Sequence, residues 1–473
     1  MRKRRIKKPN WGKTGVYLGG AGILVAIVLF VLSTFIFSPV KNINKFLTTY
    51  SNLESEKGEI VLFPKGFPSD INDRIQQLEK DINKVESSPF LSLSAESYFR
   101  LSEFYFNYTD IKKSLDFINK AISKNENIPK YYILRAIDNS YLGLFSNAKN
   151  DINSALQYAS NSKLENKIVI SSHLLNSMLF YLDGNLLKSA DSLHKFLNLP
   201  SPDEKLDKLK LFGYYFLENI YFSLAEYEKS EFYFMKTKDL RKQLEQSNMK
   251  DEITYFLLCI TAQSPDVSKA YAYFLHNADP NNTFITIIKY LYQAASAIYN
   301  DEEAEFKKNL AMCFELTKER GLNLFSHMLD LDFFEYQYLV AGGLNYNLIN
   351  RIRESPIKIP LWEAGVYELL GKYYWARNDA KKAKEYLNLA LNIFTKSGVV
   401  KEIGMVNFLL GLIEFDLKNY GNTRDHFMLS LQYINKLKEA SDRIGKDKVF
   451  QDRTRAEIEE PLKALDTIEK FIK

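Results

Sequence analysis

The stretch Ala364–Leu391, AGVYELLGKYYWARNDAKKAKEYLNLAL, contains two helix patterns separated by a polar turn at 377–379. Apolar or small residues that recur every three or four positions lie on one face of a helix. The first pattern has this spacing at Tyr367, Leu370, Gly371 and Tyr374. The second has it at Ala383, Leu387 and Ala390. The stretch therefore predicts a helical hairpin whose two helices pack through these faces.

Three positions in this hairpin are small for a packing reason. Gly371 and Ala383 allow the two antiparallel helices to approach closely, and Ala390 leaves room for the helix that follows. The pattern resembles the tetratricopeptide repeat, which places Trp or Tyr, Leu, Gly, Tyr, Ala, Phe or Leu, and Ala at these seven relative positions. All seven match here. The resemblance implies a solenoid of stacked hairpins with a concave face that binds partner proteins.

Further copies align on the small residue that opens the second helix. These residues are Ser114, Ala148, Ala190, Ser230, Ala270, Ala383 and Thr423. The first five follow one another at intervals of 34 to 42 residues, and the last two lie 40 apart. Units of this length predict an all-α solenoid over residues 95–440. Its packing residues are Ser114, Ala148, Ala190, Ser230, Ala270, Gly371, Ala383, Ala390 and Gly411.

Two segments depart from this register. Residues 284–353 are apolar and aromatic with helical periodicity but do not align on the motif, so we expect irregular helical hairpins there. Residues 441–473 are charged, with spaced apolar residues, and predict a C-terminal helix that caps the open end of the solenoid. Pro461 should start, kink or divide that helix.

Two further segments precede the solenoid. Residues 38–68 contain Pro39, Gly58, Pro64, Gly66 and Pro68, and these helix breakers predict a tether. Residues 69–94 predict a leading helix that packs on the first repeat. Its apolar seam consists of Ile71, Ile75, Leu78, Ile82 and Val85.

The N-terminus has the pattern of a membrane anchor. The apolar run Val16–Phe37 is 22 residues long. As a helix it would reach about 33 Å, which spans a hydrocarbon core of about 30 Å. Residues 1–15 contain seven Lys or Arg, so the positive-inside rule places this basic tail in the cytoplasm and the solenoid on the outer side of a bacterial inner membrane. A signal peptide cleaved near Ser38 is the alternative.

Composition argues against several functions. The chain has a net charge of +5, but residues 1–45 hold nine basic and no acidic residues. Residues 46–473 therefore carry a net charge of −4, which argues against a nucleic-acid-binding face in the folded part. The only cysteines are Cys259 and Cys313, and none of the five His stands in a metal-binding motif. We expect no enzymatic activity, cofactor, metal or small-molecule substrate.

In tetratricopeptide arrays the concave face is formed by the first helix of each pair. The matched register assigns eight candidate partner-binding residues to this face: Phe99, Phe106, Tyr215, Phe222, Lys372, Trp375, Phe408 and Phe415. The family's Lys/Asn/Arg carboxylate clamp is not supported, because these positions are mostly aromatic. Either the face binds partners, or the array's own curl or the terminal helix fills it.

The layout is similar to that of membrane-anchored tetratricopeptide proteins that build envelope machines. It predicts a scaffold for protein–protein assembly, for example a periplasmic flagellar motor collar or a secretion machine. Its partners would be other envelope proteins, and Gly15 and Gly19 leave homo-oligomer formation through the span open. The alternative is a periplasmic chaperone or translocon-associated client receptor. A mitochondrial import receptor is disfavoured by the basic N-terminus and the absent clamp.

Overall fold

A computed structural model describes residues 38–50, 71–89, 91–159, 165–199, 204–246, 302–339, 346–445 and 447–472, with scattered residues between 286 and 297. The regular elements in these ranges are α-helices. The predicted basic tail 1–15, the predicted span 16–37 and the packing residue Ala270 lie outside the described residues. Among the helices of the described part, none combines the length and apolarity needed to cross a bilayer.

The N-terminal half of the solenoid is a row of antiparallel hairpins. The pairs are α4 (Ala95–Asn107) with α5 (Ile111–Lys124), α6 (Pro129–Tyr141) with α7 (Phe145–Ala159), α8 (Glu165–Leu182) with α9 (Leu186–Leu197), and α10 (Glu204–Ser223) with α11 (Tyr227–Gln246). The second helix of each pair also contacts the first helix of the next pair. The stacking therefore follows the predicted solenoid order.

The C-terminal half continues the array. Its helices are α15 (Glu303–Arg320), α16 (Asn323–Leu339), α17 (Tyr346–Glu354), α18 (Pro360–Ala376), α19 (Ala380–Ser397), α20 (Val400–Asp416), α21 (Tyr420–Ser441) and α22 (Lys448–Ile472). Helices α18 and α19 form one hairpin, and α20 and α21 form the next. Pro461 lies inside α22, which continues on both sides of it.

Facing residues in the hairpins lie 12 positions apart. The Ser102 and Ser114 hydroxyls are 3.0 Å apart, and the Ser230 hydroxyl donates to the Glu218 carbonyl at 2.8 Å. The same offset relates Gly371 to Ala383 in α18 and α19. The packing residues lie buried: Ser114, Ala148, Ala190, Ser230, Ala383 and Ala390 are at most 4% exposed.

Two glycines lie where a side chain would collide with the partner helix. A Cβ atom on Gly371 would stand 2.5 Å from the Cγ atom of Leu387, and one on Gly411 would overlap the ring of Phe427. The absence of a Cβ at these two positions is therefore what permits the close approach within each hairpin.

Residues 38–50 differ from the predicted tether, because they form helix α2 (Ser38–Tyr50). Ile43 and Leu47 are at most 1% exposed, and Phe46 packs edge-to-face on Phe104 of α4. The prediction gave Pro39 too much weight as a helix breaker. In the first turn its missing N–H costs no intrahelical hydrogen bond.

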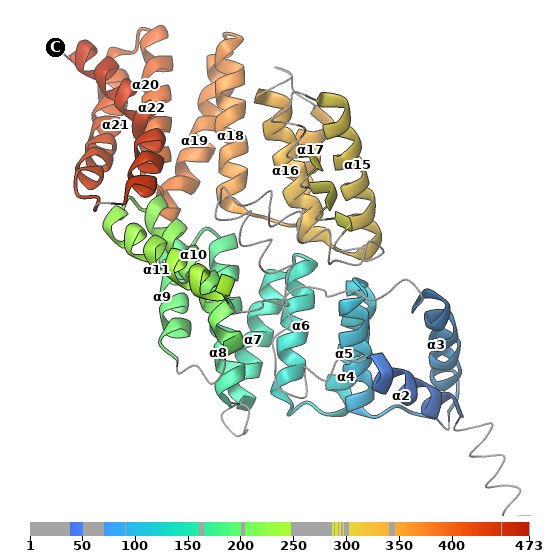
Figure 1. The fold of residues 1–473 in the computed structure, drawn as a ribbon. Helices are drawn as coiled ribbons and strands as arrows, with labels where there is room; N and C mark the ends of the chain where they lie inside the picture. The colour runs from blue at the N-terminus through green and yellow to red at the C-terminus, as the bar shows by residue number, and fades with distance from the viewer. Residues whose placement is uncertain are drawn as a thin grey trace, which may run out of the picture.

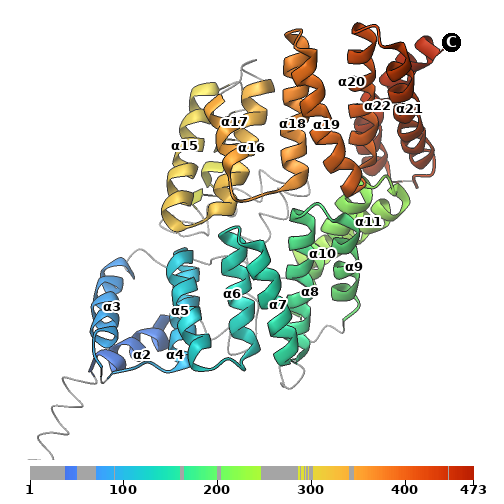
Figure 2. The same ribbon diagram turned by 180° about the vertical axis from the view of Figure 1, so that it is seen from behind.

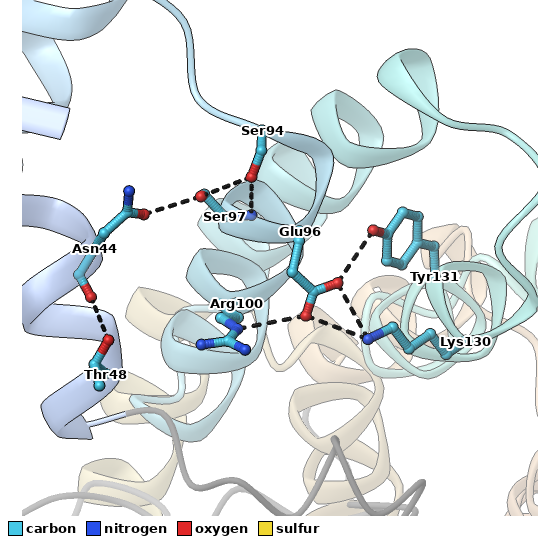
Figure 3. A network of polar contacts seen from close by, with 8 residues as sticks. All are labelled: Asn44, Thr48, Ser94, Glu96, Ser97, Arg100, Lys130 and Tyr131. Atoms are coloured by element: carbon cyan, nitrogen blue, oxygen red, sulfur yellow. Dashed lines mark hydrogen bonds and ion pairs between the residues drawn. The ribbon is translucent and has the colours of Figure 1, made fainter. Parts of the chain in front are cut away.

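Polar contacts fasten this N-terminal region to the solenoid (Figure 3). The hydroxyl of Ser97 in α4 donates to Asn44 of α2 at 2.9 Å, and the neighbouring Glu96 joins the first two hairpins by pairing with Lys130 of α6 at 3.2 Å. Helix α3 (Ile71–Glu86) packs on α2 and forms an ion pair of 2.5 Å between Glu79 and Lys113 of α5. Its predicted seam from Ile71 to Val85 is buried.

The array folds back on itself into two tiers, one containing α2 to α11 and the other α15 to α22 (Figures 1 and 2). Helix α6 contacts α16, where Tyr141 stacks on Phe325 with ring centroids 5.7 Å apart. The turn after α6 passes so close to Ile357 that Gly143 has no space for a Cβ, and its φ of +77° also favours glycine. One apolar core runs through both tiers, from Ile43 to Ile413.

Candidate functional site

Helix α22 covers the concave side of α20. Ala464, Leu465 and Ile468 of α22 form an apolar cluster in which Phe408 and Leu412 of α20 are partly buried. This contact does more than cap the end of the solenoid, because it partly covers Phe408, a candidate partner-binding residue, as the self-filled alternative predicts.

The start of α22 and the loop before it bridge to the first tier, and we call this bridge the closing contact. Phe450 lies edge-to-face on Phe222 of α10, with ring centroids 6.1 Å apart. Arg453 forms an ion pair with Glu218 of α10, and Asp447 pairs with Lys238 of α11 at 2.9 Å. Segments more than 200 residues apart in sequence are thus held together at one end of the molecule (Figure 1).

The ion pair at the closing contact is largely shielded from water. The side chain of Glu218 is 3% exposed and that of Arg453 is 32% exposed. Burial raises the pKa of the Glu218 carboxyl above its usual value, and the Arg453 guanidinium opposes this rise. The guanidinium also lies 4.7 Å from the ring centroid of Phe222. Arg453 therefore compensates the energetic cost of burying the Glu218 carboxylate.

Five predicted partner-binding residues make contacts within the chain, and three of them, Phe222, Phe408 and Phe415, are half-buried. Phe99 and Phe106 are 3% and 1% exposed, and they pack on Tyr131 and Tyr141 of α6. Phe222 and Phe408 contact α22 as described, and Phe415 lies 4.7 Å from Phe471 between ring centroids. The chain's own curl and its terminal helix fill this part of the concave face.

The other three predicted residues are half-buried. The indole N–H of Trp375 donates to the carboxylate of Asp416 at 2.9 Å. Burial raises the pKa of Tyr215 to about 12, with a further rise from Glu218. Lys372 pairs with Glu368 one turn earlier in α18, at 2.8 Å, and both line a cavity.

This cavity has a volume of about 400 Å³ and lies among α16, α18, α20 and α22. Its apolar lining is Leu331, Leu361, Trp362, Val366, Leu369 and Met405. Its charged lining is Glu368, Lys372, Lys401, Glu402 and Glu460. Gly365 forms part of the wall, and a Cβ atom built on it would meet nothing within 4 Å. We call this site the α18 cavity, and it is the candidate binding site.

Sequence reasoning found Lys372 but missed most of the α18 cavity. Glu402 follows α18 in the next hairpin, and Glu460 belongs to the terminal helix. The positions of Glu402 and Glu460 near Trp362 depend on how α18, α20 and α22 pack together. The spacing of residues within one helix does not indicate this packing. The available signal was Trp362 in the first turn and Gly365 in the second turn of the helix that also contains the matched Tyr367.

Within the part of the chain that the structure describes, no group of three or more His, Cys, Asp or Glu side chains could hold a metal ion. Cys313 is buried, and burial raises the pKa of its thiol to about 12. Cys259 lies outside the described residues.

The comparisons with known proteins add no argument to the fold assignment, which is based on the hairpins described above. No family model and no curated protein sequence matches the chain. Among solved structures, yeast Tom70 matches with a TM-score of 0.31 and 15% identity, over 85% of this chain and 97% of that chain. The Cut9–Hcn1 hetero-tetramer of APC/C matches with a TM-score of 0.29 and 13% identity, over 81% of each chain.

The P58(IPK) TPR domain matches with a TM-score of 0.21 and 12% identity, over 79% of this chain and 98% of that chain. Superpositions this loose carry no argument about function. The repeated hairpins, the 12-residue offset and the buried small residues are what make this chain a tetratricopeptide-like solenoid.

Proposed function

We propose that the protein is a scaffold that binds partner proteins at the α18 cavity. The observation that supports this proposal is the contrast between the α18 cavity and the aromatic residues that α22 contacts. Phe222, Phe408 and Phe415 are covered by α22, whereas the α18 cavity keeps an open volume of about 400 Å³ with charged and apolar walls. Long clefts that hold unfolded clients need exposed apolar surface, so the covered aromatic residues favour a scaffold over a chaperone.

Recruitment should depend on the open space above Gly365. In Gly365→Leu, the new side chain would project into the α18 cavity, because Gly365 lines this cavity and no atom lies within 4 Å of a Cβ there. We expect this variant to fold and to lose its partners in a pull-down from detergent extract. Gly421→Leu is the matched control, since a Cβ on this helical glycine of α21 also meets nothing within 4 Å. Undiminished recruitment by Gly365→Leu would rule out the cavity as the site.

The same pull-down separates the two functional classes. A scaffold returns a few partners at fixed ratio, and a chaperone or client receptor returns many proteins in small amounts. Fixed-ratio partners that belong to one envelope machine, such as a flagellar motor collar or a secretion system, would support the assembly role that the layout suggests.

We further propose that residues 16–37 anchor the protein in a bacterial inner membrane, with residues 1–15 in the cytoplasm and the solenoid outside it. The proposal is supported by the 22-residue apolar run and the seven basic residues before it. An alkaline phosphatase fusion at residue 100 should be active, because that reporter needs export. An inactive fusion, together with an active cytoplasmic reporter at the same residue, would reverse the orientation.

A further inference from the structure

We propose that the α18 cavity binds a Lys or Arg side chain of the partner protein, with Glu402 as its counter-ion. This inference rests on the proposed function and names the chemistry that the partner must present. It follows from three features of the cavity: a carboxylate in its walls that has no ion pair, the half-buried position of that carboxylate, and the apolar surface beside it.

The cations in the walls already have partners. Lys372 pairs with Glu368 at 2.8 Å, and Lys401 pairs with Glu457 of α22 at 2.5 Å. Glu402 makes no ion pair within 4 Å among the described residues, and its side chain lines the same volume. An anionic ligand would have to displace a carboxylate from Lys372 or Lys401, whereas a cation finds Glu402 available.

Glu402 is half-buried in the first turn of α20. Burial raises the pKa of this carboxyl to about 7, Lys401 and the residue's own backbone N–H oppose the rise, and Glu368 and Glu457 add to it. The charged form is thus held at a cost that a cation in the α18 cavity would relieve. The other charged groups that face the site are Lys372 from α18 and Glu460 from α22, and the α16 wall contributes the uncharged Leu331.

The remaining walls suit a long cationic side chain. Lys and Arg have apolar stems that pack on hydrophobic surface while the charged end reaches a polar group. Leu331, Leu369 and Met405 supply such a surface, and Trp362 supplies an indole, the aromatic group that attracts cations most strongly. A small inorganic cation would leave these apolar walls unused.

The test measures binding of a fluorescent peptide, acetyl-Gly-Leu-Arg-Leu-Gly, to the full-length chain in detergent. Its twin carries citrulline, which has the shape of arginine without the charge. We expect the arginine peptide to bind at least about 10-fold more tightly, and Glu402→Gln to remove most of that difference. Binding to the unsubstituted chain should also weaken as pH falls below about 7, because protonated Glu402 is no longer a counter-ion.

Two controls keep the result interpretable. Gly365→Leu should abolish binding of the arginine peptide, and Gly421→Leu should leave it unchanged. Circular dichroism melting of Glu402→Gln shows whether the variant keeps its fold. Equal binding of the two peptides, or unchanged binding of the arginine peptide by folded Glu402→Gln, would overturn the inference. If Gly365→Leu loses natural partners while Glu402→Gln keeps them, the cavity is still the partner site, but the partner does not present a cation to it.

Discussion

Arg453→Ala is expected to lower the free energy of unfolding by about 3–5 kcal/mol, because it leaves the buried carboxylate of Glu218 without its cation. Urea denaturation followed by circular dichroism measures the change. The matched control is Arg455→Ala in the same helix. Arg455 is 75% exposed and lies 3.8 Å from an exposed Asp452 carboxylate, so its loss should change stability by less than about 0.5 kcal/mol.

The loss of stability in Arg453→Ala should change with pH in a direction that can be checked. Burial raises the pKa of Glu218 in the folded state above the ordinary 4.5, and removal of Arg453 should raise it further. A group that binds its proton more tightly when folded adds stability as pH falls. Arg453→Ala should therefore be least destabilising near pH 5 and most destabilising near pH 8, roughly. Equal losses at both pH values would mean that Glu218 is not buried against Arg453.

Gly371→Leu is expected to destabilise the α18–α19 hairpin by about 1–3 kcal/mol or more, the usual range for overpacking a core. Its Cβ alone would stand 2.5 Å from the Cγ atom of Leu387 and 3.3 Å from the Ala383 carbonyl oxygen, so the helices must separate. Because solenoid repeats stabilise their neighbours, hydrogen exchange should accelerate in α20 and α21 as well as in α18 and α19.

Gly365→Leu is the control for this second prediction. It makes the same change in the same helix, six residues earlier, where a Cβ meets nothing within 4 Å. Leu has a higher helix propensity than Gly by up to about 1 kcal/mol, so this variant should be as stable as the original chain or more so. Two variants of equal stability would show that Gly371 is not at a helix crossing.

The sequence predicted the helical hairpins whose packing residues lie close together in the chain. Tyr367, Leu370, Gly371, Ala383 and Leu387 lie within 21 residues, and their hairpin appears as expected. The same reasoning failed at residues 38–50, where Pro39 was counted as a breaker although it occupies the first turn of α2.

The sequence left open whether the terminal helix fills the concave face, and which residues it covers could not be predicted, because this depends on contacts between distant segments. Phe222 and Phe408 have the helical positions expected of a binding face, and each is covered by α22 instead. The contact between Arg453 and Glu218 joins residues 235 positions apart, and no pattern in either helix indicates the pairing. The α18 cavity remains because α22 crosses α20 beside it and contributes only Glu460 to its wall.

The central claim is that the solenoid closes on itself through α22, which contacts Phe222 and Phe408 and leaves the α18 cavity open beside it. Zero-length carbodiimide cross-linking of the full-length chain tests it directly, because the reagent joins an amine to a carboxylate only when they touch. Lys238 and Asp447, 2.9 Å apart across the closing contact, should be joined, as should Lys113 and Glu79, 2.5 Å apart within the first tier. Recovery of the Lys113–Glu79 link without the Lys238–Asp447 link would contradict the closed arrangement.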